Sequence, residues 1–365
     1  MRKVLFRFIY DDYWGWQPVE NELLIGIGWL LALWCVIAAT AMAITWKMTK
    51  DKTQVRNASV IWIIIPLGII AARWMKLPFT ETGIPVFGYG FMMFVGFSTA
   101  TLLAARRVTT LGLPSDIIWD MMMWLLIPGL IGARVIYLSQ NWQNVMAGKQ
   151  GLEQLTALVA LWDGGIVFYG SIIGGVIGLF AYCRVRKLDP IAMCDVIAPS
   201  LFIGSGFGRI GCFLYGCCFG HACSLPWAVQ FPRDSLTFER LVQRGTVSPE
   251  AMQTIPLHPT QLYSSAASFL LAGLLAWVFR HRRFDGQVIA LAWILYPVNR
   301  YVLEVFRNDE PARLGTGQTF SQLMSLALVL SGVAALYWFS RRGRITRVPS
   351  KQHAAPEKPL QPGRV

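Results

Sequence analysis

Nine apolar stretches are the feature that most constrains this chain, because each is about as long as a helix that crosses a lipid bilayer. A spanning helix needs about 20 residues, with a range of about 17–25. The stretches lie near residues 23–46, 58–75, 84–105, 117–138, 164–183, 191–215, 260–279, 287–306 and 319–340. Of the 365 residues, 55% are hydrophobic and 15% are charged, whereas soluble domains average about 25% charged residues. The sequence therefore predicts an all-α, polytopic membrane protein.

Positive charge falls in short bursts, and one burst follows every odd-numbered stretch. The bursts are Lys47, Lys50, Lys52 and Arg56; Arg106 and Arg107; Arg184, Arg186 and Lys187; Arg280, Arg282 and Arg283; and Arg341, Arg342, Arg344 and Arg347. Cytoplasmic loops carry an excess of lysine and arginine. We therefore expect the N-terminus outside, the C-terminus in the cytoplasm, and the connections 139–163 and 216–258 outside. Because topology explains the net charge of +13, no nucleic-acid partner is expected.

The stretches group into three predicted regions. Residues 1–80 form an N-terminal extension with about two transmembrane helices, and residues 81–340 form a core of seven transmembrane helices that includes the external loop 216–258. Residues 341–365 form a basic, proline-rich tail that we expect to be disordered. The first stretch is too long for the apolar part of a cleavable signal peptide, and Asp11 and Asp12 precede it, so we interpret it as a span.

Three arginines lie inside predicted spans, where a charged side chain costs at least about 2.5–3.5 kcal/mol. They are Arg134, Arg209 and Arg300, each in the outer half of the membrane on the predicted topology. The planar guanidinium group donates two parallel hydrogen bonds to a phosphate. The arginines thus indicate either a site for an anionic lipid headgroup or structural ion pairs between helices.

Two further patterns add candidate polar groups. Tyr296, Arg300 and Glu304 follow one another at intervals of four residues on one helix face, with Arg307 close by. Arg300 and Glu304 either neutralise each other or present oriented donors to a substrate. His258 precedes the seventh stretch, where it can serve as an acid or base or as a helix cap.

Four cysteines are close together in the sequence, at positions 212, 217, 218 and 223. A zinc site is disfavoured, because such sites take ligands from two separate knuckles. A disulfide between Cys217 or Cys218 and Cys223 suits an oxidising exterior, and a catalytic thiol is a further alternative. We expect no metal and no cofactor.

The motif that contains the first three of these cysteines resembles the signature of the prolipoprotein diacylglyceryl transferase family. That signature is G-R-x-G-N-F-φ-N-x-E-x-x-G, where φ is apolar, and residues 208–220 read GRIGCFLYGCCFG. The glycines, arginine and phenylalanine match. Cys212 and Tyr215 replace the two asparagines, and Cys217 replaces the glutamate.

Other stretches resemble family motifs in the expected order over about residues 84–340. They are VFGYGFMMFVGF with Tyr89, GARVIYL with Arg134, GGIVFYGSIIGG with Tyr169, HPTQLY with His258 and Gln261, and the Tyr296–Arg300–Glu304–Arg307 spacing. The third of these stretches resembles the family's G-G-x-x-F-H-G-G, in which the histidine is Tyr169 here and the last glycine is Ser171.

The resemblance implies transfer of a diacylglyceryl group from phosphatidylglycerol to the lipobox cysteine thiol of prolipoproteins, with release of glycerol-1-phosphate. It implies a multi-pass enzyme of the bacterial cytoplasmic (inner) membrane, surrounded by membrane lipids. The residues it implies for catalysis are His258, Tyr169, Arg209 and Arg300. Those it implies for substrate binding are Tyr89, Arg134, Gly208, Gly220, Gln261, Tyr296, Glu304 and Arg307.

The missing histidine leaves the general base open. A tyrosine is a poor base near neutral pH, so we expect His258 to accept the proton of the acceptor thiol and Tyr169 to donate a hydrogen bond to substrate. Two other classes of function remain. One is a transporter or flippase for an anionic lipid or peptide, and the other is a catalytically altered paralogue that acts in membrane assembly or lipid binding.

Overall fold

A computed structural model describes residues 4–49 apart from 11, 20 and 21, the single residues 67 and 71, and residues 83–343 apart from 161–163 and 308–318. The chain divides into two compact units, which are described one at a time. The first unit comprises Met1–Val95, Phe207–Tyr263 and Phe306–Asp309. The second comprises Gly96–Gly206, Ser264–Val305 and Glu310–Val365.

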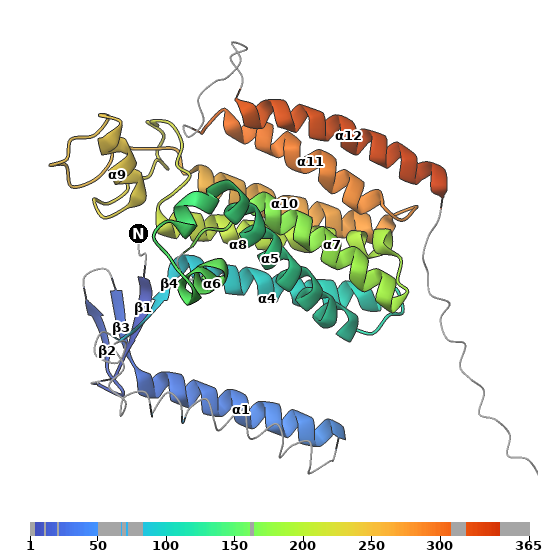
Figure 1. The fold of residues 1–365 in the computed structure, drawn as a ribbon, viewed down its shortest axis with the longest axis horizontal. Helices are drawn as coiled ribbons and strands as arrows, with labels where there is room; N and C mark the ends of the chain where they lie inside the picture. Colours follow the sequence, from blue (N-terminus) through green and yellow to red (C-terminus); the bar gives the residue numbers. More distant parts are fainter. Residues whose placement is uncertain are drawn as a thin grey trace, which may run out of the picture. The chain divides into compact units, whose positions relative to one another are not determined.

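Long apolar helices dominate the described residues (Figure 1). Six of them are long and apolar enough to cross a membrane: α4 (Gly88–Thr109), α5 (Asp116–Met146), α7 (Phe168–Arg186), α8 (Pro190–Tyr215), α10 (Thr260–His281) and α12 (Phe320–Arg342). A seventh, α11 (Gln287–Glu304), also forms but falls short of that measure. Each predicted core span coincides with one of these seven helices. The prediction of an all-α, multi-pass membrane protein is confirmed.

Glycines allow α5 and α7 to pack closely within the second unit. Gly170, Gly174 and Gly178 recur every fourth residue along α7 and are buried. A Cβ atom on Gly170 would collide with the carbonyl oxygen of Gly132, and one on Gly174 with that of Pro128. Small residues at this spacing let helix backbones approach each other in a membrane. The glycine-rich sequence of the fifth span is thus explained by packing.

A buried carboxylate organises the start of α11 in the same unit. Asp195, on α8, is fully buried and accepts hydrogen bonds from the backbone N–H groups of Gly286 at 2.8 Å and Ile289 at 2.9 Å. The guanidinium of Arg282 lies 3.9 Å away. These bonds satisfy N–H groups that have no partner inside the helix. Asp195 therefore has a structural role, which the sequence did not indicate.

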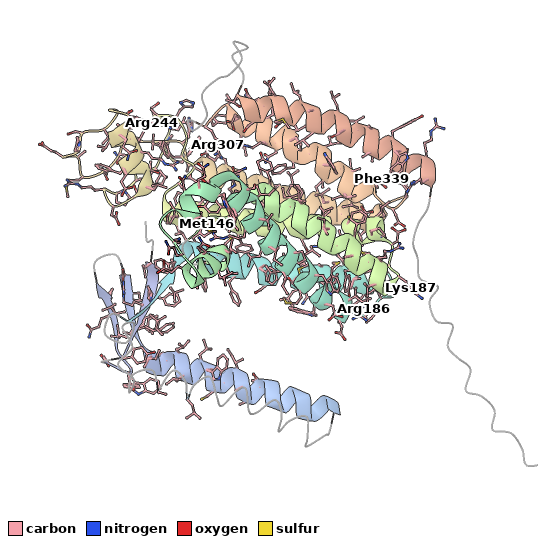
Figure 2. The ribbon with its side chains drawn as sticks, in the orientation of Figure 1. Met146, Arg186, Lys187, Arg244, Arg307 and Phe339 are labelled. Atoms are coloured by element: carbon pink, nitrogen blue, oxygen red, sulfur yellow. The ribbon has the colours of Figure 1, made fainter. Side chains whose placement is uncertain are left out.

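Helix α5 is longer than predicted. It continues to Met146, eight residues past the expected end at 138, with a non-helical residue at Asn141. The short helix α6 (Leu152–Val159) follows within the connection predicted for 139–163. Arg186 and Lys187 lie at the C-terminal end of α7 (Figure 2), where cations are favourable beside the last carbonyl groups.

The N-terminal extension contains a β-sheet that was not predicted. Strands β1 (Val4–Ile9), β2 (Trp16–Val19), β3 (Glu22–Gly26) and β4 (Ile84–Phe87) form a sheet of order β2-β3-β1-β4. β1 runs parallel to β3 and antiparallel to β4, which leads directly into α4. Arg7 on β1 pairs with Glu22 on β3 through two hydrogen bonds. Backbone hydrogen bonds thus join the extension to the start of the core.

Helix α1 (Ile27–Thr49) covers most of the first predicted span and begins where β3 ends. The predicted second span, 58–75, lies outside the described residues apart from positions 67 and 71. The tail also lies outside them beyond Gly343, whose left-handed backbone (φ 57°) ends α12. The predicted extension of two helices is therefore tested only for α1.

The region 216–258 is a small folded module with its own core, within the first unit. It contains α9 (Leu236–Gln243), whose first turn is capped by Ser235. Its buried apolar residues are Phe219, Phe231, Phe238, Leu241, Val247 and Leu257. Backbone bridges pair Leu257 with Ala222 and Val229. We expected an external loop here, and the structure shows that its conformation is fixed by apolar packing.

Candidate active site

The end of α8 determines how the cysteine motif is arranged. Gly216 has φ +76°, and its N–H group bonds to the carbonyl of Phe213 at 3.2 Å. The N–H group of Cys217 bonds to the carbonyl of Cys212 at 3.1 Å. This pair of bonds is the Schellman motif, which closes a helix with a left-handed glycine. The motif brings the residue after the glycine, Cys217, against Cys212 in the last turn of α8.

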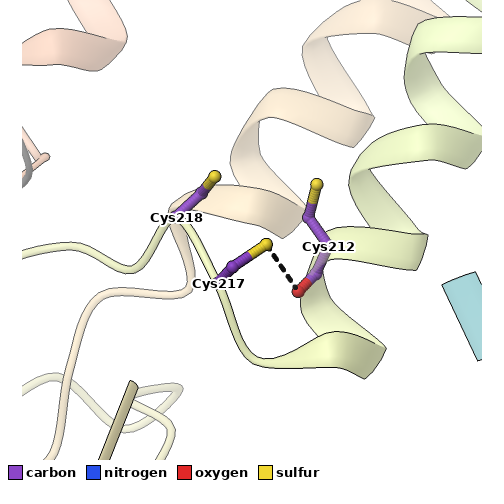
Figure 3. A group of neighbouring side chains, drawn as sticks. All are labelled: Cys212, Cys217 and Cys218. Carbon is purple, nitrogen blue, oxygen red and sulfur yellow. Dashed lines mark hydrogen bonds between the residues drawn. The ribbon is translucent and has the colours of Figure 1, made fainter. Parts of the chain in front are cut away.

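Cys218 completes a cluster of three thiols, referred to below as the thiol cluster (Figure 3). Its backbone is also left-handed, with φ +58°, which is uncommon for a residue other than glycine. The sulfur atoms of Cys212, Cys217 and Cys218 all lie within 4.8 Å of one another, and the three residues are half-buried. Cys217 Sγ donates to the carbonyl of Cys212 at 3.7 Å. All seven cysteines of the chain are free thiols, and Cys223 lies outside this group.

The HPTQ motif at the start of α10 holds the turn that carries the thiols. Thr260 Oγ1 donates to the carbonyl of Cys218 at 2.8 Å, and Gln261 Nε2 donates to that of Cys217 at 2.6 Å. Gln261 is only 1% exposed, and its Oε1 has no hydrogen-bond partner among the described residues. Gly220 is needed beside this motif, because a Cβ there would lie 2.7 Å from the Cβ of His258.

Two arginines add positive charge beside the cluster. Arg209 is half-buried on α8, and its side chain has no hydrogen bond or ion pair with any residue that the structure describes. Arg307 is buried, lies near the module (Figure 2), and pairs with Gly220 through the backbone. Hydrogen bonds from the thiols of Cys212 and Cys217, followed by the charges of Arg307 and Arg209, lower the pKa of Cys218. The first unit therefore combines thiols and guanidinium groups in one place.

His258 lies in a small aromatic cluster next to the same turn. Its Nδ1 lies 3.2 Å from the hydroxyl of Tyr263, and its ring packs edge-on against Phe306 at 5.5 Å. Trp227 Nε1 also donates to the hydroxyl of Tyr263 at 2.7 Å. If Nδ1–H donates to Tyr263, Nε2 is left to accept a proton. That tautomer is the one a general base requires.

Tyr89 and Gly208 complete the predicted residues of the first unit. The ring of Tyr89 packs edge-on against that of Tyr215 at 6.5 Å. A Cβ on Gly211 would lie 3.0 Å from the Tyr89 ring, so glycine is favoured there. Gly208, one turn earlier on α8, faces the sulfur of Met93. Seven predicted site residues thus lie in the first unit: Tyr89, Gly208, Arg209, Gly220, His258, Gln261 and Arg307.

Arg134 is a buried structural group in the second unit. It is 8% exposed and donates to the backbone carbonyls of Ala157 at 2.6 Å, Leu158 at 3.0 Å, Gly164 at 2.8 Å and Gly165 at 3.0 Å. Its guanidinium also lies over the ring of Tyr137. Because its donors are occupied, Arg134 ties α5 to the residues around α6, and these bonds favour a structural role over substrate binding.

The remaining predicted residues of the second unit lie on α7 and α11. Arg300 forms an ion pair with buried Glu304 at 2.5 Å and donates to Ser321 at 3.2 Å. This pairing is the structural alternative that the sequence left open. Tyr296 packs edge-on against Phe202 at 6.2 Å. Tyr169, at the start of α7, is 67% exposed, and its ring contacts Phe168.

A separate cavity of about 950 Å³ lies in the second unit. Its lining includes Arg106 and Arg107 at the end of α4, and Arg280 and Arg282 at the end of α10. None of the predicted site residues lines it. The cavity is therefore not the site that the motifs indicate.

The family model of prolipoprotein diacylglyceryl transferase matches residues 76–338. The phosphatidylglycerol–prolipoprotein diacylglyceryl transferase of Clostridium tetani is 36% identical over 69% of this chain and 92% of its own length. The chain belongs to this family. A second such transferase, from Clostridium perfringens, is 31% identical over 69% of this chain and 90% of its own length.

The match to a third relative concerns the N-terminal extension. The diacylglyceryl transferase of Rhodopirellula baltica is 34% identical over 92% of this chain and 89% of its own length. Coverage of 92% leaves about 29 of the 365 residues unmatched. The match therefore includes part of residues 1–80, and the extension is not unique to this member of the family.

Sequence reasoning missed how the site of this diacylglyceryl transferase is assembled. It identified Cys212, Cys217 and Cys218 but not their convergence. Gly216, directly after an apolar helix, was the available signal, because glycine at that position predicts a Schellman motif. Thr260 and Tyr263 were also missed, although both belong to the HPTQLY stretch.

Proposed function

We propose that this chain transfers the diacylglyceryl group of phosphatidylglycerol to the cysteine thiol of a prolipoprotein. Membership of the family supports the reaction. The observation that supports the location of this reaction is the environment of Arg209. Its guanidinium belongs to the family signature and has no hydrogen-bond or ion-pair partner in the described part of the chain. A cation held inside a membrane protein without a partner is costly unless a ligand binds it. The phosphate of phosphatidylglycerol is such a ligand.

The reaction needs charge stabilisation at the phosphate. The acceptor thiolate attacks the glyceryl carbon, the carbon–oxygen bond breaks, and the electron pair leaves with the phosphate oxygen. Glycerol-1-phosphate departs with one more negative charge than the bound phosphodiester carried. We assign the stabilisation of that charge to Arg209 and the nearby Arg307, and such stabilisation is often the largest contribution to catalysis.

The acceptor thiol must lose its proton, because the thiolate is the nucleophile. We propose His258 Nε2 as the acceptor of that proton, oriented by Tyr263. A lipobox cysteine and the topology with N-terminus outside and C-terminus in the cytoplasm complete the proposal. Both substrates then reach the site from the outer leaflet.

The test is a transfer assay with the full-length protein in lipid vesicles. Phosphatidylglycerol labelled in its acyl chains is supplied with a lipobox peptide, and the products are identified by mass spectrometry. We expect a diacylglyceryl thioether on the peptide and free glycerol-1-phosphate. Lipid binding without thioether would instead support the catalytically altered paralogue, and lipid movement between leaflets without thioether would support the transporter.

A further inference from the structure

The thiol cluster has the form of a three-ligand metal site. Its three cysteines come from the last turn of α8, from the Schellman turn and from the left-handed residue that follows, so the backbone holds the three residues close together. The group has three members, and no other histidine, cysteine, aspartate or glutamate among the described residues joins it. All three residues are half-buried.

We propose that Cys212, Cys217 and Cys218 bind one zinc ion, and that the acceptor thiol of the prolipoprotein occupies its fourth coordination position. The inference rests on the proposed function, because it names how that reaction activates its nucleophile. It departs from our expectation from the sequence that no metal is needed. That expectation required four ligands from two knuckles, whereas a catalytic zinc site needs three protein ligands and an open position.

The dimensions suit zinc after a small adjustment. Zinc–sulfur bonds are about 2.3 Å long, so two sulfurs in a tetrahedral site lie about 3.8 Å apart. The sulfur atoms here lie within 4.8 Å before any metal binds. Side-chain rotation of the cysteines covers that difference. Ligands that are all thiolates select zinc, copper(I) or iron–sulfur clusters, and of these zinc is the single ion that prefers a tetrahedral site and has no redox chemistry.

The surroundings balance the charge of the loaded site. Three thiolates and Zn²⁺ carry a net charge of −1, and a fourth thiolate makes it −2. Arg209 and Arg307, which lie close enough to act on Cys218 electrostatically, offset that charge. Gln261 and Thr260 donate hydrogen bonds to the carbonyls of Cys217 and Cys218, and such bonds hold the ligand residues of a metal site in position.

The acceptor thiol binds zinc as a thiolate, since a coordinating thiol is deprotonated outright, and its proton passes to His258. The zinc-bound sulfur attacks the glyceryl carbon, the carbon–oxygen bond breaks, and the phosphate leaves with the electron pair. The neutral thioether binds zinc weakly and dissociates. Zinc thereby takes over the activation of the thiol in a chain that has Tyr169 where the family has a histidine.

The first experiment measures metal binding without reference to activity. The reduced, full-length protein is dialysed against Zn²⁺ or Co²⁺, and the metal content and the cobalt–thiolate absorption are recorded. We expect about one metal per chain and a tetrahedral cobalt spectrum. Cys212→Ser, Cys217→Ser and Cys218→Ser should each weaken Zn²⁺ binding at least about 100-fold, which exceeds the usual loss when a residue that only orients a metal ligand is changed.

Cys223→Ser is the matched control. Cys223 is a buried thiol of the same module, and its sulfur accepts a hydrogen bond from Leu225 N–H that a serine oxygen can also accept. This variant should bind metal like the unchanged protein. Absence of bound metal in the reduced protein, or equal binding in all four variants, overturns the proposal. A disulfide within the cluster in protein taken directly from membranes overturns it as well.

A second experiment separates this inference from the proposed function. A lipobox peptide is added to the cobalt-loaded protein, beside the same peptide with serine in place of cysteine. We expect only the cysteine peptide to change the cobalt spectrum. Transfer at the full rate after verified metal removal would leave the proposed function standing and refute the zinc. A peptide-dependent spectrum without any transfer would establish the zinc and refute the proposed function.

Discussion

At the scale of single residues, two arginines with similar sequence contexts have opposite environments. Arg209 has no partner among the described residues, whereas Arg134 donates to four backbone carbonyls. We expect Arg209→Lys to lose about 10- to 100-fold in kcat/KM, because a charge-assisted hydrogen bond contributes about 1.5–3 kcal/mol. Its thermal stability should be unchanged. The transfer assay and a melting curve in detergent measure both.

Arg134→Lys is the comparison variant, and we expect it to lower thermal stability and not to act directly on transfer. A lysine has no planar fork to reach four carbonyls, so we expect a loss of about 2 kcal/mol or more of stability. Arg300→Lys keeps a cation beside Glu304 and should lose less activity than Arg209→Lys. Full activity of Arg209→Lys would show that the phosphate binds elsewhere.

His258 and Tyr169 are the two candidates for the general base. His258→Gln keeps a hydrogen-bonding side chain but cannot carry the proton, so transfer should fall by about 100-fold or more in folded protein, within the range typical of general bases. Tyr169→Phe should only weaken transfer, since Tyr169 is 67% exposed at the start of α7. An active His258→Gln beside an inactive Tyr169→Phe would reverse the two roles. Circular dichroism confirms that both variants fold.

At the scale of elements, the closing turn of α8 determines where the thiols meet. Gly216→Ala puts a Cβ at φ +76° and 3.1 Å from Ser235 Cβ, and a left-handed non-glycine residue costs about 1–2 kcal/mol. We expect lower stability and loss of cross-linking of the cluster by a reagent that needs two adjacent thiols. Gly148→Ala has a similar φ of +72° with open space around it. Gly148→Ala should also lower the stability, but its thiol cluster should still be cross-linked by the reagent.

The contact between α5 and α7 offers a matched pair of neighbouring glycines. A Cβ on Gly174 would collide with the carbonyl of Pro128, whereas one on Gly175 would lie 3.9 Å from the carbonyl of Leu125. Gly174→Ala should therefore lower the melting temperature, because the helices must separate. Gly175→Ala should be neutral or stabilising by up to about 1 kcal/mol, the usual gain from alanine in a helix. Equal effects of the two changes would refute the packing argument.

At the scale of the whole molecule, the alternating charge bursts predict a topology that the thiol chemistry also needs. A reporter fused after Arg344 should behave as cytoplasmic, and one inserted within residues 233–250 should behave as external, because lysine and arginine are retained on the cytoplasmic side. Fusions of a phosphatase that folds only outside the cytoplasm measure both positions. The opposite pattern would place the thiol cluster on the wrong side for the proposed acceptor.

The sequence by itself determined the class of fold and the family. Long apolar stretches leave a chain few solutions, because backbone polar groups in a bilayer must bond within their own helix. Each predicted core span accordingly became a helix, from α4 to α12. The ordered motifs around Arg209 and His258 were also readable, since the local spacing of residue types is a property of the sequence.

The tertiary structure decided what each polar residue does. Arg134 and Arg209 look alike in sequence, and only packing supplies carbonyls to one and not to the other. The sheet that joins β1 to β4 depends on pairing between segments far apart in the sequence. The sequences of such short strands do not predict that pairing. The three thiols converge because Gly216 adopts a left-handed backbone and because the HPTQ stretch, more than 40 residues later, bonds to the carbonyls of Cys217 and Cys218. Contacts between distant segments form the site, and the local sequence pattern does not predict such contacts.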